Sequence, residues 1–261
     1  MRIAEIYKSI QGEGQLTGTE STFVRASGCN LRCWFCDTPY TSWKPTGDDL
    51  SVEEILSTIR DFGCDHIVLT GGEPMLFAEI IPLCRQLHRE NYHITIETAG
   101  TLHLPVVCDL MSISPKTSGS APDPREHPKW YQRHENTRHR PEVMRRLMDE
   151  YTYQLKFVVD TPADLDDLSL TLDQYDAVDK SKVYLMPQGT EQTELLEREA
   201  WLKPFCDSQG YQFCPRMQIA WFGARQGTKA PNQFRTRLYR IRPVSGKLVG
   251  YTTKPSIRET S

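Results

Sequence analysis

Apolar and polar positions along the chain follow two periods, one typical of strands and one typical of helices. Short apolar runs predict strands at residues 3–7, 22–27, 66–69, 93–98, 106–113, 153–160 and 182–186, and near residues 212 and 217–221. Apolar residues at helical spacing predict helices over 52–62, 75–89, 142–150 and 192–209, with another between 160 and 182. Strands that alternate with helices are typical of an α/β fold with a mainly parallel sheet, whose site lies at the C-terminal edge.

The clearest local signal opens the helix predicted from residue 52. Ser51 followed by Glu54 forms a capping-box pattern. Gly63 follows the last apolar position of that helix and predicts its end. In the next helix, Pro82 predicts a kink, while Cys84 and His88 are expected to be core or half-buried residues rather than ligands.

Residues 117–140 break this pattern with prolines, histidines and many charges. We predict an irregular insertion or lid there, because little apolar material is available for packing. His127, His134 and His139 lie in this run. Their polar, proline-broken setting argues against a metal site.

Composition and charge narrow the class of protein. The chain has 261 residues, of which 38% are hydrophobic and 25% are charged, which fits one soluble domain with appendages. No apolar run reaches the about 20 residues of a membrane span. The N-terminus reads as a strand rather than a signal peptide. Eight cysteines in so long a chain argue against a secreted disulfide framework, so we expect a cytoplasmic protein.

The net charge of −3 conceals an asymmetry between two regions. Residues 229–261 contain eight basic residues and one acidic residue, so this tail carries +7 and residues 1–228 carry −10. We therefore predict a main domain over 1–228 and a basic C-terminal extension over 229–261, which is a small β appendage or disordered. The acidic domain is not a nucleic-acid binder, although the tail could touch one.

Three cysteines carry the most specific chemistry in the chain. Cys29, Cys33 and Cys36 have C-x3-C-x2-C spacing, so a short loop can turn three thiolates toward one point. A structural zinc site commonly needs four ligands in two close pairs, and no second pair is present. The alternative of three ordinary buried cysteines explains the spacing less well. We predict a four-iron cluster with one iron left open for a substrate or cofactor.

This loop, with the aromatic Phe35 before its last cysteine, resembles the radical S-adenosylmethionine (SAM) superfamily. Four further motifs, two before this loop and two after it, are similar in sequence and order to those of the 7-carboxy-7-deazaguanine synthase family. They are Ser9–Gly14, Phe23–Arg25, Thr70–Pro74 and Ser114–Lys116. The resemblance covers about residues 1–228. It implies an incomplete, partly open (β/α) barrel of the radical SAM type.

The resemblance also implies a reaction and its cofactors. Cys29, Cys33 and Cys36 would hold a [4Fe–4S] cluster whose open iron binds SAM. Reductive cleavage of SAM would give a radical that takes hydrogen from 6-carboxy-5,6,7,8-tetrahydropterin. Ring contraction with loss of ammonia would then give 7-carboxy-7-deazaguanine, a precursor of queuosine-type 7-deazapurines.

Residue roles follow from the matching motif positions. For the pterin substrate, the resemblance implies contacts from Gln11, Gly12, Glu13, Arg25 and Thr70. The implied SAM contacts are Phe35, Asp37, Gly72, Glu73, Ser114, Pro115, Lys116, Met186, Pro187 and Gln188. Thr38 would bind Mg²⁺. Glu97 is left open as a SAM contact or a structural residue.

Partners and rival functions complete the prediction. We expect an electron donor such as a flavodoxin or ferredoxin, a homodimer and no membrane partner. One alternative is another small radical SAM enzyme, such as a glycyl-radical activase. A second is a non-catalytic cluster or zinc protein with a nucleic-acid-binding tail.

Overall fold

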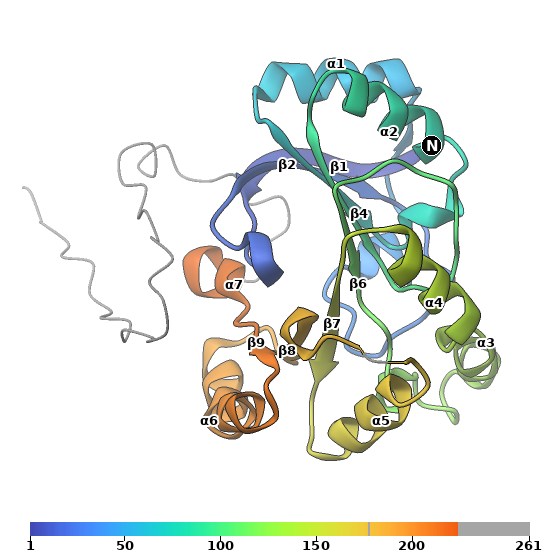
Figure 1. Cartoon of the computed structure of the whole chain (residues 1–261). Coiled ribbons are helices and arrows are strands. Elements are labelled where there is room, and N and C mark those ends of the chain that lie inside the picture. Colours follow the sequence, from blue (N-terminus) through green and yellow to red (C-terminus); the bar gives the residue numbers. More distant parts are fainter. Residues whose placement is uncertain (177, 224–261) are drawn as a thin grey trace, which may run out of the picture. The chain divides into compact units, whose positions relative to one another are not determined.

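The computed structural model describes residues 1–176 and 178–223, which fold around one curved sheet (Figure 1). Nine strands lie in the order β3-β1-β2-β4-β5-β6-β7-β8-β9. They are β1 (Arg2–Ile10), β2 (Glu20–Ala26), β3 (Asp48–Asp49), β4 (His66–Gly71), β5 (His93–Thr98), β6 (Leu110–Ile113), β7 (Tyr153–Val159), β8 (Val183–Pro187) and β9 (Gln212–Phe213). From β2 to β9 every pairing is parallel, whereas β1 pairs antiparallel with β2 and with β3. The sheet is not closed, which confirms the predicted mainly parallel, open α/β fold.

Helices and short turns connect these strands. The α-helices are α1 (Val52–Phe62), α2 (Ile80–Arg89), α3 (Pro128–Arg138), α4 (Pro141–Glu150), α5 (Ala163–Leu172), α6 (Gln192–Gln209) and α7 (Met217–Phe222). Single 3₁₀ turns lie at Gly14–Leu16, Pro39–Thr41, Pro74–Leu76, Ser118–Ser120 and Lys180–Lys182. Within the described residues, no helix has the length and apolar character needed to cross a membrane.

The core lies between the sheet and its covering helices. Ile55 and Ile59 of α1, with Leu83 of α2, are fully buried beside Ile67 and Ile94 of the sheet. Apolar residues spaced three or four apart make one helix face continuous, and this face packs on the β-branched residues of the strands. The ends of α1 are as predicted: Ser51 and Glu54 form a complete capping box, and Gly63 ends the helix at φ 60°.

Several predicted elements differ from the observed ones. Residues 217–222 form α7 rather than a strand, although their alternating apolar residues match a strand period. The strand expected over 106–113 covers only Leu110–Ile113. Pro82 produces no break, because α2 begins at Ile80 and a proline in the first helical turn costs no internal hydrogen bond.

The expectation of an irregular segment over 117–140 is wrong for its second half. Residues 128–138 form α3, with Pro128 in its first turn. The helix has one fully buried side chain, His134, so an apolar pattern could not reveal it. The β appendage or disorder expected over 229–261 lies outside the described residues.

Candidate active site

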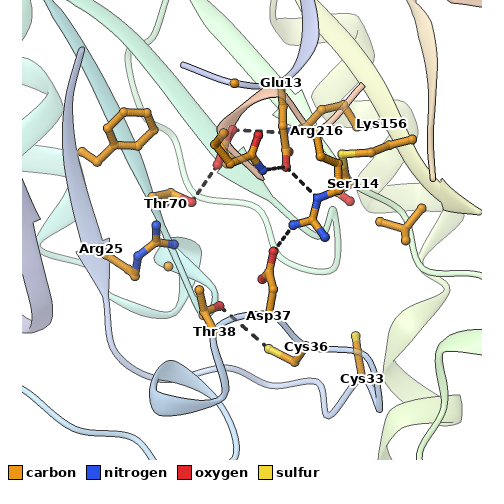
Figure 2. A pocket seen from close by; sticks show the side chains of 18 of the residues that line it. Glu13, Arg25, Cys33, Cys36, Asp37, Thr38, Thr70, Ser114, Lys156 and Arg216 are labelled. Carbon is orange, nitrogen blue, oxygen red and sulfur yellow. Dashed lines mark hydrogen bonds and ion pairs between the residues drawn. The ribbon is translucent and has the colours of Figure 1, made fainter. Parts of the chain in front are cut away.

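One cavity of about 360 Å³ lies inside the curve of the sheet, at the carboxyl ends of the parallel strands (Figure 2). Its walls include Arg25 from β2, residues 70–72 from the end of β4 and the residue after it, and residues 97–99 from β5 and the turn after it. Lys156 from β7 and Met186 from β8 complete that side. The parallel arrangement brings these strand ends to one edge, as the alternating pattern predicted.

Most of the side chains predicted for the site line this cavity. They are Gln11, Gly12, Glu13, Arg25, Cys29, Cys33, Phe35, Cys36, Asp37, Thr38, Thr70, Gly72, Ser114, Lys116, Met186 and Gln188. Pro115, Pro187 and Glu73 are not among the lining residues. In the triplets Ser114–Lys116 and Met186–Gln188 only the central proline is missing from the lining, as adjacent residues of an extended chain point to opposite sides.

Glu73 has a structural position instead of a place on the cavity wall. Its side chain is fully buried, and burial raises the pKa of its carboxyl group. The carboxylate accepts hydrogen bonds from the backbone N–H groups of Met75 and Ala99 and from the hydroxyl of Thr98. These bonds join the end of β4 to the end of β5.

The three motif cysteines are free thiols on one wall of the cavity. Burial raises the pKa of Cys29 and of Cys33 to about 12, so these sulfurs need a bound metal to become thiolates. Within residues 1–176 and 178–223, no three His, Cys, Asp or Glu side chains lie close enough to hold a single ion. A four-iron cluster does not require that closeness, because each cysteine binds a different iron.

No fourth cysteine lines the described part of the cavity. Cys64 lies just before β4, whereas the cysteine loop follows Ala26, which pairs with Gly71 at the other end of that strand. The donor set therefore fits a cluster with one iron free of protein sulfur.

The floor of the cavity is a chain of paired charges, of which Lys156 is buried and the two glutamates are half-buried. The Lys156 Nζ atom lies 2.9 Å from Oε2 of Glu13 and 3.1 Å from Oε1 of Glu97. The other Glu97 oxygen accepts from the Thr70 hydroxyl at 2.8 Å. The Gln11 amide donates to Glu97 at 3.3 Å and accepts from the Glu13 backbone N–H at 3.1 Å. Gln11 is thus already bonded within the protein, and it links the Glu97 carboxylate to the Glu13 backbone.

The ionisation states of Glu13 and Lys156 follow from their ion pairs in the cavity floor. Burial raises the pKa of Glu13, but the charges of Lys156 and Arg216 outweigh it and bring the pKa down to about 2. Burial lowers the pKa of Lys156, but Glu13 and Glu97 outweigh it, and the net pKa lies above the usual range. Glu13 is therefore anionic and Lys156 cationic at neutral pH.

Residues between Arg216 and Gly223 form a further wall. In Figure 2, Arg216 lies between Glu13 and Asp37. Its guanidinium forms an ion pair with Asp37, lies 3.5 Å from Glu13, and donates to the Gly189 carbonyl at 2.7 Å. The Gln218 amide donates to Glu13 at 2.6 Å. Arg216 thereby joins the cysteine loop, the floor and the end of β8.

Arg25 faces the cavity from β2. Its Nε atom donates to Glu5 and its Nη2 atom donates to the hydroxyl of Tyr7, each at 2.7 Å. These partners fix the plane of the guanidinium against the wall. A fixed fork of N–H donors is suited to a carboxylate ligand.

Comparison with known proteins identifies the family. The Radical SAM superfamily model matches residues 23–152. A 7-carboxy-7-deazaguanine synthase from Rhodopirellula baltica is 47% identical over 227 residues, which cover 87% of this chain and 88% of the relative. The chain belongs to the 7-carboxy-7-deazaguanine synthase family. A second member, from Halobacterium salinarum, is 41% identical over 84% of this chain and 89% of its own length.

The solved structure of QueE from Escherichia coli shares the fold. It matches with a TM-score of 0.63 at 22% identity, over 82% of this chain and 92% of that chain. These matches confirm the resemblance expected from the cysteine loop and the glycine motifs. Membership of the radical SAM superfamily implies a four-iron cluster and SAM, and it decides against the zinc-protein alternative.

Many lining residues of this family member's cavity were not predicted as site residues, and four of them belong to the polar network of its floor. Glu97 had been left open, and Lys156 could have been noticed as a charge inside an apolar strand run. Arg216 and Gln218 gave no signal, because they lie in a short segment with a strand-like pattern. Their role at the cavity follows only from contacts with residues near the N-terminus.

Proposed function

We propose that this protein is a radical SAM lyase that converts 6-carboxy-5,6,7,8-tetrahydropterin to 7-carboxy-7-deazaguanine with loss of ammonia. The family membership supports the reaction type. The observation that carries the substrate class is the charge pattern of the cavity. Carboxylates and a paired lysine lie on its floor, the three cysteines lie on one wall, and Arg25 lies on another. A glycyl-radical activase, whose substrate is a protein, has no need for this enclosed polar floor.

Cys29, Cys33 and Cys36 would hold the cluster, and Ser114 and Lys116 line the cavity near them. When bound, the reduced cluster and SAM supply the radical that removes hydrogen from the substrate. The Lys116 ammonium donates to the Ser114 carbonyl at 2.6 Å, which holds its charge at the cavity wall. It is suited to the SAM carboxylate.

Glu13 and Glu97 would bind the amide and amino edge of the pterin, which presents N–H donors. Both carboxylates are available as acceptors because Lys156 offsets their mutual repulsion. Arg25 would bind the substrate carboxylate across the cavity. Fixing both ends of the substrate sets which carbon faces SAM, and this positioning supplies much of the rate enhancement.

Mg²⁺ is assigned to Thr38, whose hydroxyl lies on the cavity wall 3.8 Å from the Cys36 sulfur. A single hydroxyl is a sparse ligand set, so the ion would keep several waters and share the substrate carboxylate. We further propose a flavodoxin or ferredoxin as electron donor, a homodimeric assembly and a cytoplasmic location. A reducing compartment suits eight free cysteines.

Anaerobic turnover tests the proposal. Wild-type protein with reconstituted cluster, SAM, a reductant and the carboxy-tetrahydropterin should form 7-carboxy-7-deazaguanine, detected by mass. Cys33→Ala should abolish turnover because one iron loses its ligand. Cys108→Ala is the matched control, since Cys108 is a half-buried thiol that does not line the cavity. Absence of product from iron-replete wild type, or normal turnover by Cys33→Ala, would contradict the proposal.

A further inference from the structure

The cysteine loop has no regular secondary structure between Cys29 and Cys36, so its conformation depends on contacts from elsewhere. Two of its backbone N–H groups are bonded within the loop: Leu31 to the Cys29 sulfur and Cys36 to the Cys33 carbonyl. Two others, on Arg32 and Trp34, are bonded to the segment 117–138. These two residues flank Cys33.

His134 of α3 is the centre of that second set of bonds. Its side chain is 1% exposed, and its Nδ1 atom accepts from the Arg32 backbone N–H at 3.1 Å. A ring nitrogen that accepts carries no proton, so Nε2 bears the hydrogen and donates to the Ser120 hydroxyl at 2.9 Å. Ser120 in turn accepts from the Trp34 backbone N–H through its carbonyl at 3.1 Å. The histidine and serine therefore hold the residue on each side of Cys33.

Side chains extend the same interface. The Arg32 guanidinium stacks on the Trp130 ring at 3.9 Å and also donates to the Cys29 carbonyl. The Trp34 indole donates to the Gly119 carbonyl at 2.8 Å. Trp130 and Gly119 both belong to the segment 117–138, so the contacts with the loop come from both its 3₁₀ turn and its helix.

The neutral state of His134 is consistent with this arrangement. Burial, with the charges of Arg138 and Lys116, lowers the pKa of His134 to about 4. The imidazole thus keeps its acceptor nitrogen at neutral pH. The segment's composition had argued against a metal-binding histidine, and both ring nitrogens are in fact occupied by protein groups.

We propose that the segment 117–138 preorganises the cysteine loop for cluster binding, and that His134 is the positioning residue. This role of His134 rests on the proposed function, because it assumes that the cysteine loop binds the iron–sulfur cluster. Groups hydrogen-bonded to metal-ligating side chains typically change metal affinity by about 10–100-fold when removed. The bond from Arg32 to His134 acts one residue away from Cys33, so we expect an effect at the lower end of that range.

Hydrogen exchange in the cluster-free protein tests the loop without requiring turnover. The variant His134→Phe keeps an aromatic ring of similar shape but loses both hydrogen bonds of the imidazole. The Arg32 amide hydrogen should therefore exchange about tenfold faster, as expected for the loss of one buried hydrogen bond. His134→Asn keeps an acceptor near the place of Nδ1 and should restore most of the protection. His139→Phe is the matched control, because this histidine of the same region bonds to Gln174 and not to the loop.

Cluster retention gives the second measurement. After anaerobic reconstitution, His134→Phe should lose iron to a chelator about tenfold faster than wild type, with His139→Phe unchanged. If His134→Phe fails to fold, Ser120→Ala can be used: it removes the hydroxyl that accepts from His134 and donates to the Thr117 carbonyl, and it should show a smaller change in the same direction. Unchanged exchange and iron loss in the folded His134 and Ser120 variants would overturn the proposal. Iron uptake by wild type without deazaguanine formation would instead contradict the proposed reaction and leave this role intact.

Discussion

At the scale of single residues, the cavity depends on charges that are buried and paired. Glu13 is 15% exposed and accepts from Lys156 and Gln218, with Arg216 close by. A buried carboxylate without such partners would become protonated, because desolvation disfavours its charged form. Glu13 therefore remains anionic in this cavity because Lys156 and Arg216, from two distant segments of the chain, offset its charge.

Replacement of Glu13 by Gln should lower stability in a pH-dependent way. The pKa of Glu13 in the folded protein, about 2, lies below the value of about 4.3 for an unfolded glutamate. Its ionisation therefore stabilises the fold above about pH 4.3, and this contribution is lost as the pH falls through about 2. We expect a difference in the free energy of unfolding on the order of 2 kcal/mol at pH 7 that shrinks by pH 3.

Urea unfolding of the cluster-free protein at pH 7, 5 and 3 measures this difference. Glu126→Gln serves as the control, because Glu126 is exposed and does not line the cavity. A Glu13→Gln penalty that stays constant across this range would show that the carboxylate acts through packing rather than charge.

At the scale of elements, the end of β4 is packed directly on the start of the cysteine loop. The Gly72 N–H donates to the Ala26 carbonyl at 3.0 Å, and the Glu73 N–H donates to the Gly28 carbonyl at 2.8 Å. A Cβ atom on Gly72 would lie 2.1 Å from the Gly28 oxygen and 2.8 Å from the Thr41 oxygen. The glycine is thus needed for close backbone approach, besides its place on the cavity wall.

Gly72→Ala should destabilise the fold by about 3 kcal/mol, because two backbone segments must separate. Gly63→Ala offers a comparison, because its loss of stability should come from backbone strain rather than from a steric clash. Gly63 ends α1 at φ 60° with open space around it, so its replacement should cost about 1 kcal/mol of backbone strain. Thermal and urea unfolding of both variants would measure the two losses in the free energy of unfolding. Equal penalties would mean that the loop shifts away from Gly72 at little cost.

At the scale of the whole molecule, the cavity is assembled from opposite ends of the described chain. The hairpin loop between β1 and β2 lies at the amino edge of the parallel strands, since Ile10 pairs with Glu20 at the start of β2. From there its Gly14 N–H reaches the Cys214 sulfur at 3.1 Å, across 200 positions in sequence. Gln11 and Glu13 of the cavity floor therefore come from the edge opposite to the cysteine loop.

Shortening the chain should separate the domain from the basic tail. A chain of residues 1–228 should keep the wild-type iron content and turnover, because every lining residue in the described part of the chain lies at or before Gly223. A chain of residues 1–213 is the matched control and should lose turnover, since it lacks Arg216 and Gln218. Binding of nucleic acid by the full chain but not by 1–228, weakening with salt, would assign that affinity to the tail. Loss of turnover in 1–228 would contradict the predicted domain boundary.

The local sequence pattern was sufficient to predict many of the secondary-structure elements and the cysteine loop. The bounds of α6 and the capping box of α1 follow from residues within one or two helical turns, where periodicity and capping act. The alternating elements predicted the parallel sheet, and with it the gathering of Arg25, Thr70 and Met186 at one edge. The three cysteines predicted a cluster loop because their spacing alone limits what they can bind.

The tertiary structure alone decided which charges meet. Lys156 pairs with Glu13 across 143 positions, and Arg216 pairs with Asp37 across 179, so no window of sequence contains both partners. The same holds for His134, which lies in a helix that the sequence did not predict and bonds to Arg32 across 102 positions. Backbone periodicity is set by neighbours in sequence, whereas the stability of a buried charge or imidazole depends on whichever groups the folded sheet brings beside it.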